Sequence, residues 1–271
     1  MSEQQLDLFA HACVWMAPPL ALRSDCSVVA ADFNDAALVA AIPDANLADC
    51  SALAAEAGRR RLAAAVPALA ALCRRFAGFR ACRAIPEQVA ALEGLALIGG
   101  RDAALAAAHM IERAVVLGPT LSVAVRVAAQ LDATLSASTL RLLLRHSDPT
   151  VRAGACRCAR PFPEVINLLV DLLDDLDPIV AKSAASALGQ MGRKEAGPIL
   201  KRLLRDAPSP EVIDSVVSIA DEECVVLLGR IARSVPELTA AALDGLDDIS
   251  HPRARAVAAT IRHWQLGGSL D

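Results

Sequence analysis

The sequence predicts an all-α fold in which a pair of helices repeats along the chain. Two stretches that begin with Asp-Pro, at Asp148 and Asp177, continue with the same apolar pattern and lie 29 residues apart. A fixed period of this length is typical of stacked structural units. The chain is 55% hydrophobic but only 3% aromatic and contains no tyrosine, whereas β-sheets favour aromatic and β-branched residues. Both observations favour helices over strands.

Each repeat divides into a helix, a glycine turn and a second helix. Pro178 would occupy the first helical position, where its missing N–H costs nothing, and the Asp177 carboxylate could accept a hydrogen bond from a free backbone N–H. Gly192 follows the first apolar stripe, where a helix end favours a left-handed residue. A second apolar stripe runs from Pro198 to Leu204. We therefore predict helix starts at Asp148 and Asp177 and a helix end near Gly192.

The motif Asp-Pro-x-Val-Arg/Lys, followed by an Ala-rich helix that ends in Ala-Leu-Gly-x-x-Gly, resembles the HEAT repeats of the phycobilisome-lyase-like type. The resemblance covers roughly residues 145 to 206 and implies a right-handed α-solenoid, or superhelix. Weaker units in phase with it bring the prediction to about seven HEAT-type helical pairs. The predicted upstream pairs are Asn46–Ala57 with Arg61–Phe76, Pro86–Leu97 with Ala103–Val116, and Pro119–Leu131 with Leu135–His146, and the downstream units open at Ser209 and Val235 and end near Trp264.

The domain organisation follows from the stacking. Because each pair contacts only its neighbours, we expect one solenoid over residues 31–271 without an internal boundary. Residues 1–30 do not fit the repeat, and Pro18-Pro19 interrupts them. We therefore expect an N-terminal tail or capping segment over residues 1–30.

Composition also limits where the protein works. No run of 18 or more apolar residues is present, and Met1 to Phe9 carries acids and glutamines where an export signal would be basic. The eight cysteines form no paired Cys-x-x-Cys arrangement, and Cys156 and Cys158 are expected to be small buried residues rather than metal ligands. These features predict a cytoplasmic protein that does not enter a membrane. The net charge of −4 is unfavourable for indiscriminate binding to nucleic acid.

The sequence contains no recognisable catalytic, cofactor or metal motif. Its five histidines are scattered without HxH or HExxH spacing, and no phosphate-binding loop or GxSxG elbow occurs. The many carboxylates, such as Asp148, Asp177 and Asp206, fall at helix junctions, where capping explains them. We therefore predict no catalytic residue, no metal site and no cofactor.

Charge is divided between the two kinds of junction. Turns within helical pairs would line one edge of the solenoid, and the predicted basic edge consists of Arg59, Arg60, Arg61, Arg101, Arg160, Arg193 and Lys194. Junctions between pairs carry acids, including Asp148, Asp175, Asp177 and Asp206. Either these charges simply complement helix dipoles, or the basic edge receives an acidic protein or a nucleic-acid backbone.

The N-terminal pentapeptide Gln5-Leu6-Asp7-Leu8-Phe9 resembles the motif Gln-Leu-(Ser/Asp)-Leu-Phe, with which bacterial polymerases, mismatch-repair proteins and replication regulators dock on the sliding clamp. The resemblance implies that Leu8 and Phe9 fill a hydrophobic pocket and that Gln5 hydrogen-bonds at its edge. An alternative remains open, because Leu6 and Phe9 are also spaced as one face of a helix that could cap the solenoid.

These observations together favour a noncatalytic scaffold or adaptor of a bacterial cytoplasm. It would bind a protein partner on its concave face and could dock on the sliding clamp through Gln5 to Phe9. A nucleic-acid-binding or DNA-glycosylase-like protein that uses the basic edge is the first alternative, although few aromatic residues are available to stack on a base. The resemblance adds a second alternative, a lyase or chaperone-like helper for a modified protein.

Overall fold

The structure, a computed structural model, describes residues 30–79 and 82–267, and every regular element in these ranges is a helix. The α-helices are α1 (Asp35–Ala41), α2 (Cys50–Arg59), α3 (Val66–Arg74), α4 (Pro86–Ile98), α5 (Gly100–Glu112), α6 (Pro119–Gln130), α7 (Ala137–Leu144), α8 (Pro149–Arg157), α9 (Pro163–Asp171), α10 (Pro178–Gln190), α11 (Gly197–Asp206), α12 (Pro210–Val217), α13 (Glu222–Ser234), α14 (Thr239–Asp248) and α15 (Pro252–Gly267). Short 3-10 helices are η2 (Ala30–Asp32), η3 (Ala63–Ala65), η4 (Leu172–Asp174), η5 (Lys194–Ala196) and η6 (Pro236–Leu238).

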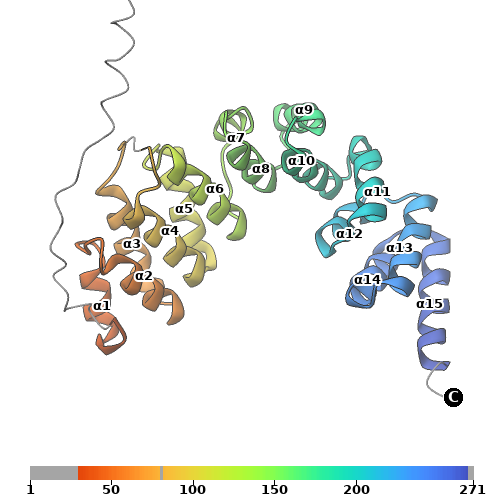
Figure 1. Ribbon diagram of the computed structural model, residues 1–271, viewed down its shortest axis with the longest axis horizontal. Coiled ribbons are helices and arrows are strands. Elements are labelled where there is room, and N and C mark those ends of the chain that lie inside the picture. Colours follow the sequence, from red (N-terminus) through yellow and green to blue (C-terminus); the bar gives the residue numbers. More distant parts are fainter. Residues whose placement is uncertain (1–29, 80–81, 268–271) are drawn as a thin grey trace, which may run out of the picture.

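The helices form two layers that follow an arch (Figure 1). The even-numbered helices from α2 to α14 pack each against the next and make the inner layer. The odd-numbered helices from α3 to α15 make the outer layer, where neighbours such as α5 and α7 contact each other less closely. Looser contact is expected on the convex side of an arch. The predicted all-α solenoid is confirmed, whereas its right-handed sense and the number of pairs stay predictions.

The predicted helix starts in the repeat are confirmed. The Asp148 carboxylate accepts a hydrogen bond from the backbone N–H of Thr150 at 2.8 Å, and the Asp177 carboxylate accepts one from Ile179 at 2.8 Å. Gly192 has a φ of +71° just after α10, as a left-handed helix end requires. Local sequence chemistry therefore sets where these helices begin and end.

The predicted boundaries are less accurate near the N-terminus. The helix predicted from Arg61 begins five residues later, because Arg61 adopts a φ of +50° and the N–H of Leu62 bonds back to the carbonyl of Ala57. This closes α2 before the chain enters η3. Helix α1 was not predicted, although Asn34 caps it through a hydrogen bond to the N–H of Ala37. The division at residue 30 between tail and solenoid stays a prediction.

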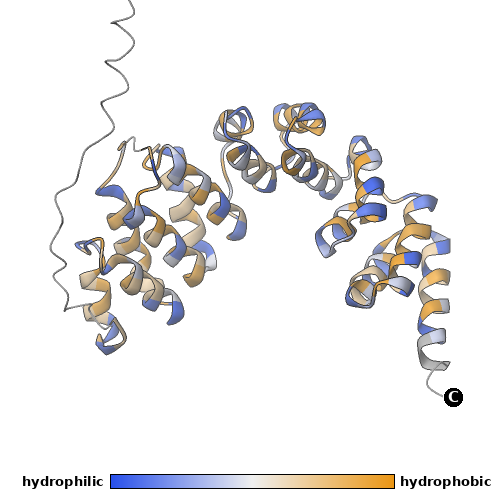
Figure 2. Cartoon of the chain, in the orientation of Figure 1, coloured by the Kyte–Doolittle hydropathy of each residue, from blue (hydrophilic) through white to orange (hydrophobic). Residues whose placement is uncertain are grey.

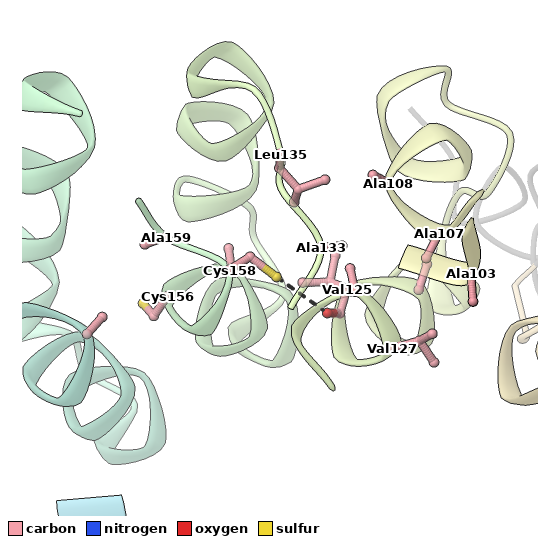
Figure 3. Close-up of a cluster of buried hydrophobic side chains, with 14 of the residues drawn as sticks. Ala103, Ala107, Ala108, Val125, Val127, Ala133, Leu135, Cys156, Cys158 and Ala159 are labelled. Atoms are coloured by element: carbon pink, nitrogen blue, oxygen red, sulfur yellow. Dashed lines mark hydrogen bonds between the residues drawn. The ribbon is translucent and has the colours of Figure 1, made fainter. Parts of the chain in front are cut away.

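The core lies between the layers and is built from small aliphatic residues. Figure 2 shows hydrophobic residues along the helix sides and hydrophilic residues mainly at helix ends and turns. Figure 3 shows part of the core, where the Cys158 thiol points to the Val125 carbonyl, with 3.8 Å between sulfur and oxygen. Burial raises the pKa of the Cys156 and Cys158 thiols to about 12. The prediction that both are small buried residues is confirmed.

Small residues also allow close contact between neighbouring helices of the inner layer. A Cβ atom at Gly189 of α10 would lie 2.2 Å from the carbonyl oxygen of Ser215 in α12. Because that oxygen belongs to the backbone, a side chain at this position would push the two helices apart. This contact keeps the inner layer continuous from α10 to α12.

Candidate partner-binding surface

The residues of the predicted basic edge lie in or beside the connections between paired helices. Arg59 is the last residue of α2 and Arg60 and Arg61 follow it, Arg101 is the second residue of α5, Arg160 follows α8, and Arg193 and Lys194 follow α10. Most of these side chains are partly or fully exposed. Their value as a binding surface therefore depends on how much of their charge is already paired.

Arg60 fastens the first described residues to α2. Its guanidinium group donates to the carbonyls of Phe33 at 2.8 Å and Ala31 at 3.1 Å, and to the Asp35 carboxylate at 2.9 Å. It also pairs with Glu56 at 2.6 Å, as does Arg59. Hydrogen bonds from Arg59 and Arg60 lower the pKa of Glu56 to about 2. The spacing of Glu56 to both arginines along one helix is a sequence signal that would have revealed this pairing.

Two further residues of the basic edge are also paired. Arg160, in the turn between α8 and α9, pairs at 2.6 Å with Asp132, in the turn between α6 and α7. Arg193 pairs with Glu195 at 2.7 Å. Within residues 30–79 and 82–267, Arg61, Arg101 and Lys194 form no ion pair. The edge thus presents less free positive charge than its composition suggests.

Three of the four acids named at the junctions between pairs have structural partners. Asp148 and Asp177 cap helices, and Asp175 forms a two-bond ion pair with Arg152 at 2.9 Å. The Arg152 side chain is 17% exposed and that of Asp175 8%. Hydrogen bonding to Arg152 lowers the pKa of the Asp175 carboxyl, which therefore stays ionised. Capping thus explains Asp148 and Asp177 and ion pairing explains Asp175, whereas Asp206 makes no hydrogen bond or ion pair through its side chain within the described ranges.

The free surface of the inner layer, which we call the inner face, carries charge that sequence reasoning missed. A groove of about 290 Å³ crosses α6, α8 and α10. We call it the basic groove, and it is lined by Ser122, Val123, Arg126, Thr150, Ala153, Gly154, Arg157 and Ile179. Thr150 and Arg157 are the exposed positions of α8, whereas Val151 and Cys156 are buried. Helical spacing therefore turns Thr150 and Arg157 to the same free side, with the buried Ala153 between them.

Positive charge collects along the basic groove. Arg157 makes no ion pair with any residue that the structure describes, and Arg126 meets Glu93 of α4 only at 3.5 Å. Lys182 of α10 is half-buried, is also without an ion pair in the described ranges, and occupies the repeat position equivalent to Ala153. Arg126 and Arg157 are distant in the sequence, and the stacking of α6 on α8 brings them to one groove, whereas Lys182 lies on α10, the next inner helix, and does not line the groove.

The next inner helices carry the opposite charge. A second groove, of about 240 Å³, lies between α12 and α14. We call it the acidic groove, and it is lined by Pro210, Ile213, Asp214, Val217, Ala241, Asp244, Gly245 and Asp248. Asp214, Asp244 and Asp248 are exposed, and none forms a salt bridge within the described part of the chain. The inner face thus changes sign between α10 and α12.

A third cavity lies at the C-terminal end of the stack. It has a volume of about 440 Å³ and is lined mainly by apolar atoms from α13, α14 and α15, including Ile261 and Trp264.

Within the described ranges, no group of three or more His, Cys, Asp or Glu side chains is arranged to hold a metal ion. None of the described helices combines the length and apolar character needed to cross a bilayer.

The peptide Gln5 to Phe9 lies outside the described residues, so its two interpretations stay open.

A search of curated proteins found no match to this chain. Residues 137–220, which span α7 to α12, match the family model of HEAT repeats. Combined with the all-helical, two-layered stack, this match supports a HEAT-repeat protein.

Proposed function

We propose that this chain is a noncatalytic scaffold that binds a protein partner on its inner face and docks on the bacterial sliding clamp through Gln5 to Phe9. HEAT repeats are typically noncatalytic and fit a repeat scaffold for protein–protein interaction. The inner face is the observation that carries the proposal. Among the charges in its two grooves, Arg157, Asp214, Asp244 and Asp248 form no salt bridge with a described residue, whereas four of the seven cations of the basic edge are ion-paired.

The N-terminal end of the described fold supports docking over capping for Gln5 to Phe9. Helix α1 packs on α2 and buries Leu38 and Ile42. Arg75 adds a second tie by donating to the carbonyls of Pro43 at 3.0 Å and Ala45 at 2.8 Å. Residues 30–49 therefore already cover the open end of the first pair, so a further cap is not required.

Clamp docking is tested with the full chain and a purified bacterial sliding clamp. Fluorescence anisotropy compares the wild type with a Leu8→Ala, Phe9→Ala double variant and with Asp7→Ser, which keeps the motif pattern. We expect micromolar binding that Asp7→Ser retains and the double variant loses, with unchanged melting temperatures for both. Absence of wild-type binding, together with a lowered melting temperature for the double variant, would favour the capping interpretation.

The nucleic-acid alternative has weaker support. Of the seven residues of the basic edge, Arg59, Arg60, Arg160 and Arg193 are ion-paired with acids. A DNA backbone would have to displace those acids and would meet their negative charge at the same turns. Affinity for duplex DNA that falls steeply with salt and is lost in an Arg61→Ala, Arg101→Ala variant would revive this alternative.

A further inference from the structure

We propose that the inner face binds an extended polypeptide segment of mixed charge, whose acidic part lies in the basic groove and whose basic part lies in the acidic groove. This inference rests on the proposed scaffold function and specifies the chemistry of the partner. It follows from the order of the charges along the arch, most of which form no salt bridge with a described residue; Arg126 meets Glu93 at 3.5 Å.

The basic groove fits the acidic part of such a segment. Arg126 of α6 and Arg157 of α8 both line it. The hydroxyls of Ser122 and Thr150 beside them donate to the Pro119 carbonyl and the Asp148 carboxylate, so their oxygens remain able to accept from backbone N–H groups of a bound segment. Alanine and glycine, at Ala153 and Gly154, form part of the lining between the two arginines. Because small residues leave room, a polypeptide backbone could approach the helices closely while its carboxylates reach the guanidinium groups.

An apolar contact distinguishes this groove from a simple patch of charge. Ile179 opens α10, lines the groove and is 62% exposed. Val123 of α6 lines the same groove and is half-buried. A partner that places an apolar side chain against these two residues would bury surface that water now covers. An acidic segment with an interspersed apolar residue therefore fits better than a chain of charges alone.

The acidic groove fixes the order of the charges along the bound segment. Asp214 lies on α12, and Asp244 and Asp248 lie one turn apart on α14, so carboxylates line both walls. Helix α10 packs directly against α12, and Lys182 on α10 occupies the repeat position that Asp214 occupies on α12. The sign of the inner face therefore reverses across one helix–helix contact. The charge of a bound segment must therefore change from negative to positive over the same short distance.

This reversal decides between a polypeptide and a nucleic acid. A nucleic-acid backbone is negative along its whole length. It would gain from Arg126 and Arg157 but would be repelled by the three aspartates of the next groove. Among the described residues, no aromatic side chain lines either groove to stack on a base. A polypeptide can match both signs because acidic and basic residues can follow one another along it.

The test uses the full chain and labelled synthetic peptides in fluorescence anisotropy at low salt. The mixed peptide joins an acidic block, a spacer that contains leucine, and a basic block; acidic-only and basic-only peptides and a duplex DNA serve as comparisons. Arg157→Glu and Asp214→Lys reverse one charge in each groove. Arg141→Glu on α7 and Asp171→Lys on α9 make the same charge changes at exposed outer-layer positions and serve as matched controls.

We expect the mixed peptide to bind most tightly. Arg157→Glu should weaken the mixed and acidic-only peptides about tenfold, because attraction becomes repulsion, and should not weaken the basic-only peptide. Asp214→Lys should weaken the mixed and basic-only peptides by a similar factor. The outer-layer controls should stay within about twofold of the wild type.

Three results would overturn the inference: equal losses in the outer-layer controls, no loss in either groove variant, or tighter binding of DNA than of the mixed peptide. None of them involves Gln5 to Phe9. A protein that binds the clamp but lacks this peptide pattern would keep the scaffold proposal and lose the inner-face inference. A protein that shows the expected peptide pattern but does not bind the clamp would keep the inner-face inference and lose the clamp-docking proposal.

Discussion

Two regions of the stack link successive junctions between helical pairs, one through a charged side chain and the other through a neutral one. At the start of α8, Arg152 donates to the carbonyls of His146 at 2.9 Å and Ser147 at 3.0 Å in the preceding junction, and it pairs with Asp175 in the next junction. At the start of α4, Gln88 donates to the carbonyl of Phe76 in the preceding junction and to that of Val115 in the next junction, both at 3.3 Å, and to the carbonyl of Cys73 near the end of α3 at 3.1 Å. Each side chain ties two successive junctions together.

The difference between the two regions follows from burial. Gln88 has no exposed surface, and Thr120 adds a second buried tie by accepting a hydrogen bond from the N–H of Ile85 at 3.0 Å. Arg152 and Asp175 lie closer to solvent at the edge of the stack. A neutral amide avoids the cost of burying a charge, whereas a partly hydrated site accepts an ion pair. The repeat therefore requires a donor at this place rather than one residue type.

The largest effect is expected from Gln88→Leu, which removes a buried donor shared by junction carbonyls. The three hydrogen bonds from Gln88 to the carbonyls of Cys73, Phe76 and Val115 would be lost, although each carbonyl keeps a backbone N–H partner. At about 1 kcal/mol for each bond, the free energy of unfolding should fall by about 3 kcal/mol, measured by urea denaturation. Hydrogen exchange should rise in α3 to α6 and remain unchanged in α13 to α15, because each repeat contacts only its neighbours. Gln130→Leu makes the same change at an exposed position and should have little effect.

A smaller loss is expected from Arg152→Met, which breaks the charged tie. The variant leaves Asp175 and two carbonyls with fewer partners, and we expect a loss of about 2 kcal/mol, moderated by partial exposure. Arg141→Met on the exposed side of α7 is the matched control. A loss in Arg152→Met no larger than in the control would show that the edge tie contributes nothing.

Arg152→Gln tests the comparison itself. If a donor is all that the junction requires, glutamine should keep a bond to a neighbouring carbonyl and lose only the ion pair with Asp175. We therefore expect a loss of about 1 kcal/mol, roughly half that of Arg152→Met, in the same denaturation experiment. Equal losses in the two variants would mean that the positive charge, and not the donor, holds this junction.

The smallest effect is expected in the dependence of stability on pH. The folded pKa of Asp175 lies below its usual value of about 3.9, so its contribution is present above that value and is lost as pH falls through the folded pKa. Wild-type stability should therefore fall more than that of Asp175→Asn between about pH 5 and pH 2, by less than about 1 kcal/mol. Identical pH profiles would contradict the ion-pair role. The Gln88 tie has no titratable group and should not contribute.

Much of the fold could be predicted because its signals are local. Asp148 and Asp177 cap helices through hydrogen bonds to residues two positions away, and Gly192 ends a helix through its own backbone angle. Such interactions depend only on nearby residues, so they can be recognised without knowledge of the fold. Helix α1 and the late start of α3 escaped prediction, because an unusual φ at Arg61 and a short cap at Asn34 carry weaker signals.

The candidate site could be predicted far less well. The basic edge stays a prediction as a binding site, and the acids that pair with Arg160 and Arg60 across the stack come from positions 28 and 25 residues away. The two grooves of the inner face were not predicted. Arg126, Arg157 and Lys182 are separated by whole helical pairs and show no sequence cluster.

The sequence alone determined that the chain forms a stack of helical pairs, because capping, glycine turns and apolar period act within a few residues. Only the tertiary structure decided which charges are paired and which remain free. Whether Arg157 faces solvent or Arg152 reaches Asp175 depends on how each helix turns against its neighbours. Coulomb and hydrogen-bond energies depend on distance in space, and the stacking sets those distances.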